Sequence, residues 1–144
     1  MQLEIYQQET QKLSKKHSKV LTKIRQQITQ NNEVSLIEEQ AMLHSLQVTI
    51  ENAIGKARHI LKLHHKKVPI SAYDLFEELK SQGFIQMEEL NQWKKIIGLS
   101  NTIVHEYMKV NIELVTNVIL DKKYEFVLMF LNLPFEHFVE GSSS

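Results

Sequence analysis

The sequence predicts an all-α protein, an up-and-down four-helix bundle with one short additional helix. Apolar residues recur at helical spacing along most of the 144 residues, and no stretch alternates apolar and polar residues as a β-strand would. Only four glycines and two prolines interrupt this pattern, which suits long helices joined by few turns. Several helices that each carry one apolar stripe bury those stripes best in a bundle.

The first helix is expected from Leu3 to Ile28. Its apolar stripe is thin, and most other positions hold polar residues such as Gln, Lys and Thr, so it needs a partner surface to be stable. The stripe consists of Tyr6, Thr10, Leu13, His17, Val20, Leu21, Ile24 and Ile28. For His17 we expect a packing role in the interior rather than a role as a ligand.

The second helix is expected to begin after Ser35, because Ser35 and Glu38 have the spacing of a capping box. It should run to about His65, a length of about 45 Å at 1.5 Å per residue, and serve as the spine of the bundle. Its core stripe is Leu43, Leu46, Ile50, Ala53, Ile54, Ala57, Ile60 and Leu61. Gly55 in mid-helix suggests the close approach of another element.

Basic residues gather at the end of this second helix: His59, Lys62, His64, His65, Lys66 and Lys67. The favoured interpretation is that these cations complement the negative C-terminal end of the helix dipole. A local phosphate-binding patch is the first alternative. A metal site is the least favoured, because adjacent histidines diverge on a helix and carboxylates are missing nearby.

A short helix follows from Ala72 to Gln82, with Ser71 as its N-cap. Gly83 has the position of a C′ glycine, and Phe84 can make the closing hydrophobic contact. The next helix begins near Glu88 and Glu89, whose charges favour a helix N-terminus, and it includes Trp93.

The last helix is expected from Ile112 to about Leu131, with Asn111 as its cap. The inward residues should be Leu114, Val115, Val118, Ile119, Val127 and Leu131. The segment from Tyr124 to Phe138 contains five of the ten Phe and Tyr residues of the chain. We expect part of this aromatic surface to be available for a subunit contact.

Composition predicts one domain over residues 1–138, followed by a flexible tail over 139–144. The 17 basic and 17 acidic residues give a formal net charge of zero, so the chain as a whole does not attract nucleic acid. The absence of cysteine excludes disulfides and thiolate metal sites. No apolar run has transmembrane length, and the N-terminus lacks the layout of a signal peptide, so a cytoplasmic location without membrane contact is expected.

The helix from Trp93 onward differs from the others because polar groups stand among strongly apolar neighbours. Its sequence is WKKIIGLSNTIVHEYMKVN, up to Asn111. Asn101 and His105 are four residues apart and share one face, while Ser100 and Tyr107 share the adjacent face two turns apart. Gly98 costs a helix about 1 kcal/mol relative to alanine, which suggests that a backbone or a ligand approaches there.

The segment GLSNTIVHEYMKVN resembles the signature of the HepT-like proteins of the HEPN superfamily, and the resemblance extends from about Leu43 to Leu131. It includes ENAIGKARHILKLHHKKVP and the GF that precedes the motif helix. Those proteins carry a glycine, then Arg-Asn, then His-x-Tyr. Gly98, Asn101, His105 and Tyr107 match that pattern, and Ser100 stands where the family has its arginine.

The resemblance implies a metal-independent RNA endonuclease without a cofactor, whose composite cleft forms between the motif helices of a homodimer. It implies His105, Asn101 and position 100 as catalytic positions, Gly98 as a packing position of the dimer cleft, and Tyr107 as the residue modified by a partner. That partner is an MNT-type nucleotidyltransferase antitoxin. The resemblance thus implies that the chain is the HepT-like toxin of a type VII HEPN/MNT toxin–antitoxin pair, with RNA as its ligand.

The missing arginine predicts impaired RNA cleavage, because serine brings no charge to the phosphate. Lys94, Lys95 and Lys109 are alternative cations near the motif. An inactivating substitution and natural decay would look alike at Ser100. The alternative function is a non-catalytic helical module that docks on a nucleotidyltransferase, and a third is a plain assembly bundle. For the polar residues themselves, the alternative is that Asn101 and His105 pair inside the bundle and Tyr107 only packs.

Overall fold

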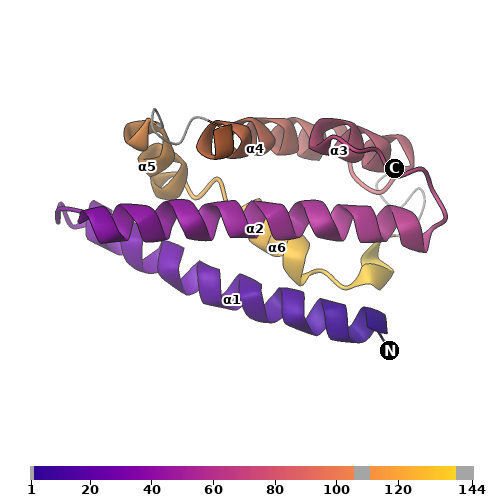
Figure 1. The fold of residues 1–144 in the computed structure, drawn as a ribbon, viewed down its shortest axis with the longest axis horizontal. Coiled ribbons are helices and arrows are strands. Elements are labelled where there is room, and N and C mark those ends of the chain that lie inside the picture. The colour runs from indigo at the N-terminus through magenta and orange to yellow at the C-terminus, as the bar shows by residue number, and fades with distance from the viewer. Residues whose placement is uncertain (1, 106–110, 139–144) are drawn as a thin grey trace.

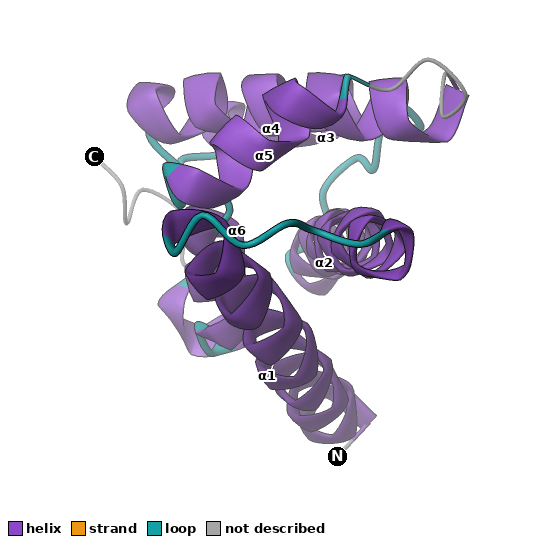
Figure 2. Ribbon diagram, turned by 90° about the vertical axis from the view of Figure 1, so that its left-hand side faces the viewer, coloured by secondary structure: helices purple, strands orange, loops and turns teal. Residues whose placement is uncertain are grey.

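The protein is a bundle of helices around a central helix, α2. The structure is a computed structural model that describes residues 2–105 and 111–138. Its helices are α1 (Gln2–Thr29), α2 (Leu36–Leu63), α3 (Ala72–Ser81), α4 (Met87–His105), α5 (Ile112–Leu120) and α6 (Glu125–Asn132), and a 3-10 turn follows at Phe135–His137. Helices α1 and α6 pack on one side of α2, and helices α3 and α4 pack on its other side (Figures 1 and 2). The all-α prediction is confirmed, and no described helix is long and apolar enough to cross a membrane.

The predicted helix caps are confirmed. The Ser35 hydroxyl accepts a hydrogen bond from the backbone N–H of Glu38 at 3.1 Å, and the Glu38 carboxylate accepts one from the Ser35 N–H at 3.0 Å. Ser71 and Asn111 cap α3 and α5 with a single bond each, as their side-chain oxygens accept from the N–H groups of Asp74 and Leu114. Gly83 has a positive φ of 81°, and the N–H of Phe84 bonds to the Leu79 carbonyl at 2.9 Å, which closes α3 with a Schellman motif.

The prediction of one continuous last helix is wrong, because the chain turns between α5 and α6. Lys122 has a φ of 54°, and the N–H of Lys123 bonds to the Val118 carbonyl at 3.0 Å. This is the stop that glycine usually makes, here with a lysine at the left-handed position. Arg25 of α1 donates from Nε to the last carbonyl of α5, that of Leu120, at 3.2 Å and fixes the end of that helix.

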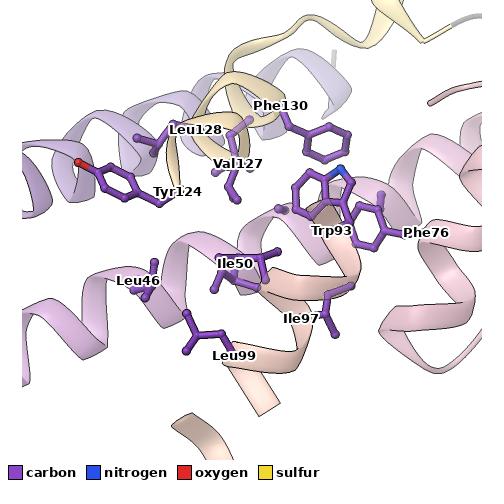
Figure 3. Close-up of a cluster of buried hydrophobic side chains, with 14 of the residues drawn as sticks. Leu46, Ile50, Phe76, Trp93, Ile97, Leu99, Tyr124, Val127, Leu128 and Phe130 are labelled. Carbon is purple, nitrogen blue, oxygen red and sulfur yellow. The ribbon is translucent and has the colours of Figure 1, made fainter. Parts of the chain in front are cut away.

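The core forms where α2, α3, α4 and α6 meet around Trp93, which is 1% exposed. The indole stacks on Phe76 with ring centres 4.3 Å apart, and Phe126 and Phe130 meet it edge-on at 4.9 and 5.0 Å. Figure 3 shows Trp93 between Phe76 and Phe130, above Ile50 and Ile97. Nearly all the predicted inward residues are buried or half-buried. Leu114 is the exception at 50% exposed, because α5 turns this side chain into a cleft beside α4.

The C-terminal aromatic residues are mostly internal, which corrects the expectation that they leave surface for a subunit contact. Phe126 is half-buried, and Tyr124, Phe130, Phe135 and Phe138 are each 5% exposed or less. Three of the buried rings surround the ammonium group of Lys56 at 5.4 to 5.5 Å. These aromatic residues therefore serve the packing of α6 and the following turn.

Lys56 is a buried cation that holds the end of α6. Its Nζ donates to the carbonyl oxygens of Phe130 at 2.7 Å, Leu131 at 3.3 Å and Leu133. Burial lowers the pKa of Lys56 to about 8. Because the last carbonyls of a helix have no partner within the helix, this lysine from α2 supplies the donors that α6 lacks.

Polar side chains also lie buried between α1 and α2. His17 is 5% exposed, and its Nδ1 lies 3.0 Å from the hydroxyl of Ser45. The rings of Tyr6 and His59 lie against each other at a tilt of 33°, with ring centres 4.1 Å apart. Its hydroxyl lies 3.4 Å from where a side chain on Gly55 would begin, so the close approach expected at this glycine is a tyrosine side chain. The packing role predicted for His17 is confirmed.

We predict that stability falls as the pH drops below about 6.5, the usual pKa of histidine. Burial, followed by the charges of His44 and Lys16, lowers the pKa of His17. The unfolded chain therefore binds a proton at a pH where the folded chain does not, and acid favours unfolding. Urea unfolding at pH 7.5 and pH 5.0 measures the free energy of unfolding. In His17→Gln this free energy should fall less between the two pH values. An equal loss in both proteins would contradict this assignment.

Candidate functional site

Ser100, the position of the family arginine, lies inside the bundle and contacts α2. It is 4% exposed, and its hydroxyl donates to Oε1 of Gln47 at 2.9 Å. The amide of Gln47 donates in turn to the carboxylate of Glu51, also at 2.9 Å. A short chain of hydrogen bonds thus runs from the motif helix across α2 to an exposed carboxylate, and position 100 of this protein presents no charge.

Gly98 and Asn101 lie on a different side of α4 from Ser100. A side chain at Gly98 would begin 3.2 Å from the hydroxyl of Tyr73, at the start of α3. The nearest neighbour of this glycine is therefore a tyrosine side chain, and its expected role in a dimer cleft stays a prediction. Asn101 is exposed, so the interpretation of Asn101 as an interior hydrogen-bonding residue is wrong for this chain.

His105 is the last residue of α4, one helical turn beyond Asn101. Its position in the helix agrees with the predicted shared face, while its side chain lies outside the described part of the structure, as do Tyr107 and Lys109. The catalytic role of His105 and the modification of Tyr107 remain predictions from the sequence.

The structure places the alternative cations on α4 away from Ser100. Lys94 forms an ion pair with Glu77 of α3 at 2.8 Å. Lys95 lines a cleft between α4 and α5. Six and five residues before Ser100, these side chains point away from its face by more than a quarter turn. Of the two arginines, Arg25 holds the end of α5 and Arg58 donates to the carbonyl of Ile70 at 3.1 Å.

The basic end of α2 is partly used for packing. His59 packs against the tilted ring of Tyr6, and burial followed by the charge of Lys62 lowers the pKa of His59. His64 contacts Phe84 with ring centres 4.8 Å apart and places Nε2 2.9 Å from the carbonyl of Phe138. Lys62, His65 and Lys67 are exposed. Among the side chains that the structure describes, no three His, Asp or Glu groups gather as metal ligands would.

Two residues that contact the motif helix could not be predicted from the motif. Gln47 is the partner of Ser100, and Tyr73 is the neighbour of Gly98. Gln47 and Glu51 have the spacing of a side-chain pair on one helix, but nothing in the sequence of α4 indicates which residue of α2 lies opposite.

Comparison with solved structures defines the class of the fold. One match is a chain of a toxin–antitoxin crystal structure with AMP-PNP, with a TM-score of 0.73 and 21% sequence identity. The superposition covers 88% of this chain and 97% of the matched chain. A tri-AMPylated HEPN toxin from Shewanella oneidensis, solved in complex with an MNT antitoxin, superposes on 87% of this chain and 95% of its own with a TM-score of 0.72 at 22% identity. The chain has the helical fold of these two matched chains.

The sequence comparison is more specific. The model of the HepT-like family, described as ribonuclease HepT-like, matches residues 14–130, and the chain belongs to this family. The mRNA nuclease HepT of Shewanella oneidensis strain MR-1 is 30% identical over 81 residues, which cover 56% of this chain. The match spans 61% of the length of that relative.

Proposed function

We propose that this protein is the HepT-like toxin component of a HEPN/MNT toxin–antitoxin pair, with an RNA endonuclease fold whose activity is impaired by Ser100. The observation that carries the impairment is the burial of Ser100 and its hydrogen bond to Gln47. A hydroxyl committed to a neutral amide offers neither charge nor a free donor to a phosphate. Loss of such a donor lowers a rate by about 10²–10³.

The chemistry of the proposed site follows from proton transfer and charge. Cleavage of RNA by its own ribose requires proton transfer at the 2′-oxygen, for which a histidine such as His105 is suited near neutral pH. The phosphate then gains negative charge, which an arginine fork would stabilise. Asn101, exposed one turn before His105, supplies an uncharged polar contact.

We infer that the chain works as a homodimer, since one motif helix provides too few polar groups for a complete site. An isologous contact would bring the two copies of the motif together across a twofold axis. The C-terminal aromatic residues do not supply this contact, because they are internal.

The second candidate function is a non-catalytic module that docks on a nucleotidyltransferase. The same buried Ser100 favours it, because an uncharged motif is compatible with binding and modification without cleavage. The partner is the MNT-type enzyme in both candidates, and they differ in whether RNA is cut.

The experiment is to co-express the chain with the MNT-type nucleotidyltransferase proposed as its partner and to purify the pair by a tag on the enzyme. Both candidate functions predict a stable complex. Purified chain is then incubated with a defined RNA. Slow cleavage that disappears in His105→Ala supports the impaired toxin, and no cleavage supports the binding module. An enzyme that elutes without the chain would contradict both.

A further inference from the structure

A cleft of about 590 Å³ opens between α4, α5 and the start of α6, on another side of the motif helix from Ser100. Its floor is apolar and contains Ile96, Leu99 and Val118. At its edge Leu114 is 50% exposed. A hydrophobic pocket with an exposed leucine at its mouth is typical of a place where another apolar side chain is inserted.

The rim of this cleft is basic. It carries Lys95, Lys122 and Lys123, with Asp121 as its carboxylate. Lys123 lies 4.0 Å from Asp121, and Lys122 lies 4.0 Å from Glu125 outside the cleft. Exposed ion pairs at this distance contribute little free energy, so they hold these lysines only weakly. Lys95 is exposed and has no ion pair among the described residues. The rim keeps a net positive charge on a chain whose net charge is zero.

We propose that this cleft is the docking site of the partner nucleotidyltransferase, which inserts an apolar segment flanked by Asp or Glu residues. The proposal rests on the proposed function. Apolar side chains of the segment would fill the floor, and its carboxylates would pair with the three lysines. Charges at such a rim steer association and select the partner, and buried apolar contacts provide most of the affinity.

The position of the cleft explains why docking there would serve modification. Thr102 of α4 and Leu114 of α5 both line it, and Tyr107 lies between them in the sequence, five residues after Thr102. An enzyme held against both helices is anchored on each side of the stretch that contains its proposed acceptor. Such anchoring raises the effective concentration of the reacting groups.

Two other occupants fit the cleft less well. RNA would use the lysines, but single-stranded bases favour aromatic platforms, and this floor is aliphatic apart from the half-buried Phe126. A second copy of this chain is the closer competitor, because Gly98, the expected packing position of a dimer cleft, also lines this cleft. On a twofold axis, however, the basic rim would meet the same rim of the other copy. Like charges brought together in this way oppose association.

The test reverses the charge of the rim in the full chain with Lys95→Glu, Lys122→Glu and Lys123→Glu. The matched control reverses three exposed lysines of α1 with Lys12→Glu, Lys15→Glu and Lys19→Glu, which changes the net charge equally. A second pair of variants tests the apolar part of the cleft. Leu114→Glu is compared with Met129→Glu, at an exposed apolar residue of α6 that is 66% exposed. Circular dichroism checks that each variant is folded.

Titration calorimetry measures the Kd for the MNT-type nucleotidyltransferase proposed as the partner, and light scattering measures the mass of the chain alone. We expect the rim variant and Leu114→Glu to bind the enzyme at least tenfold more weakly, with both controls within about threefold of the unmodified chain. Unchanged binding of the rim variant and Leu114→Glu would overturn the docking site and leave the proposed function intact.

Other outcomes identify a different occupant. If the rim variant keeps its affinity for the enzyme but becomes monomeric, the cleft holds a second copy. If it keeps that affinity but loses binding to a labelled single-stranded RNA, the cleft holds RNA. Either result overturns the docking site. An unmodified chain that fails to bind the enzyme removes the proposed function, and the docking site with it.

Discussion

Replacing Ser100 with arginine is expected to raise the rate of RNA cleavage at least tenfold. The substitution restores a charged group that can stabilise the phosphate as negative charge develops. Tenfold is below the usual effect of such a donor, about 10²–10³, because position 100 is 4% exposed. The initial rate of cleavage of a defined RNA by purified protein measures the effect.

The surroundings of Ser100 determine how this variant should be designed. An arginine that follows the present hydrogen bonds would meet Gln47 and then the carboxylate of Glu51. Adding Gln47→Ala gives the longer side chain room and should increase the gain further. Ser100→Met is the control of similar length without charge, and His105→Ala should abolish the added activity. An inert Ser100→Arg protein of intact fold, with or without Gln47→Ala, would contradict the assignment of position 100.

Truncating the central aromatic residue, Trp93→Ala, is expected to lower the free energy of unfolding by about 3–5 kcal/mol. The indole is 1% exposed and contacts three phenylalanine rings from α3 and α6. The bundle cannot close the resulting cavity without moving α3 relative to α4. Urea unfolding measures the change, and Met129→Ala, at a site 66% exposed, should lower the free energy by less than about 1 kcal/mol. A loss below 1 kcal/mol for Trp93→Ala would show that this cluster is not the core.

The helices and their caps were predictable because their signals are local. Ser35 with Glu38, Ser71, Asn111 and the Gly83–Phe84 pair each fix a helix end through neighbours in the sequence. The break after α5 was not predictable in this way. Its left-handed residue is Lys122, and lysine is not a residue that marks a helix stop.

The burial of polar groups could not be predicted from the sequence, because it depends on elements that are distant along the chain. Lys56 lies beside Gly55 in a basic segment, yet its ammonium group ends among carbonyls and rings that come more than seventy residues later in the chain. Ser100 and Gln47 are 53 residues apart. The motif therefore indicates candidate residues of α4, whose roles stay predictions, and only the packing of α4 on α2 shows that Ser100 faces inward.

The packing of the basic end of α2 could not be predicted from the sequence for the same reason. His59 and His64 are held against Tyr6 and Phe84, which no helical pattern within α2 could indicate. The exposed members, Lys62, His65 and Lys67, remain compatible with the expected effect on the helix dipole.

The modification of Tyr107 tests the central proposal, membership of a toxin–antitoxin pair with an MNT-type enzyme, most directly. Purified chain is incubated with the MNT-type nucleotidyltransferase proposed as its partner, ATP and Mg²⁺, and the intact mass of the chain is measured. A phenol is a suitable acceptor when the enzyme supplies metal and nucleotide, and the added negative charge would oppose RNA entry. We predict a gain of whole adenylate units that is absent in Tyr107→Phe and retained in Tyr73→Phe, the matched variant at an exposed tyrosine. An unchanged mass in the presence of an active enzyme would contradict the account.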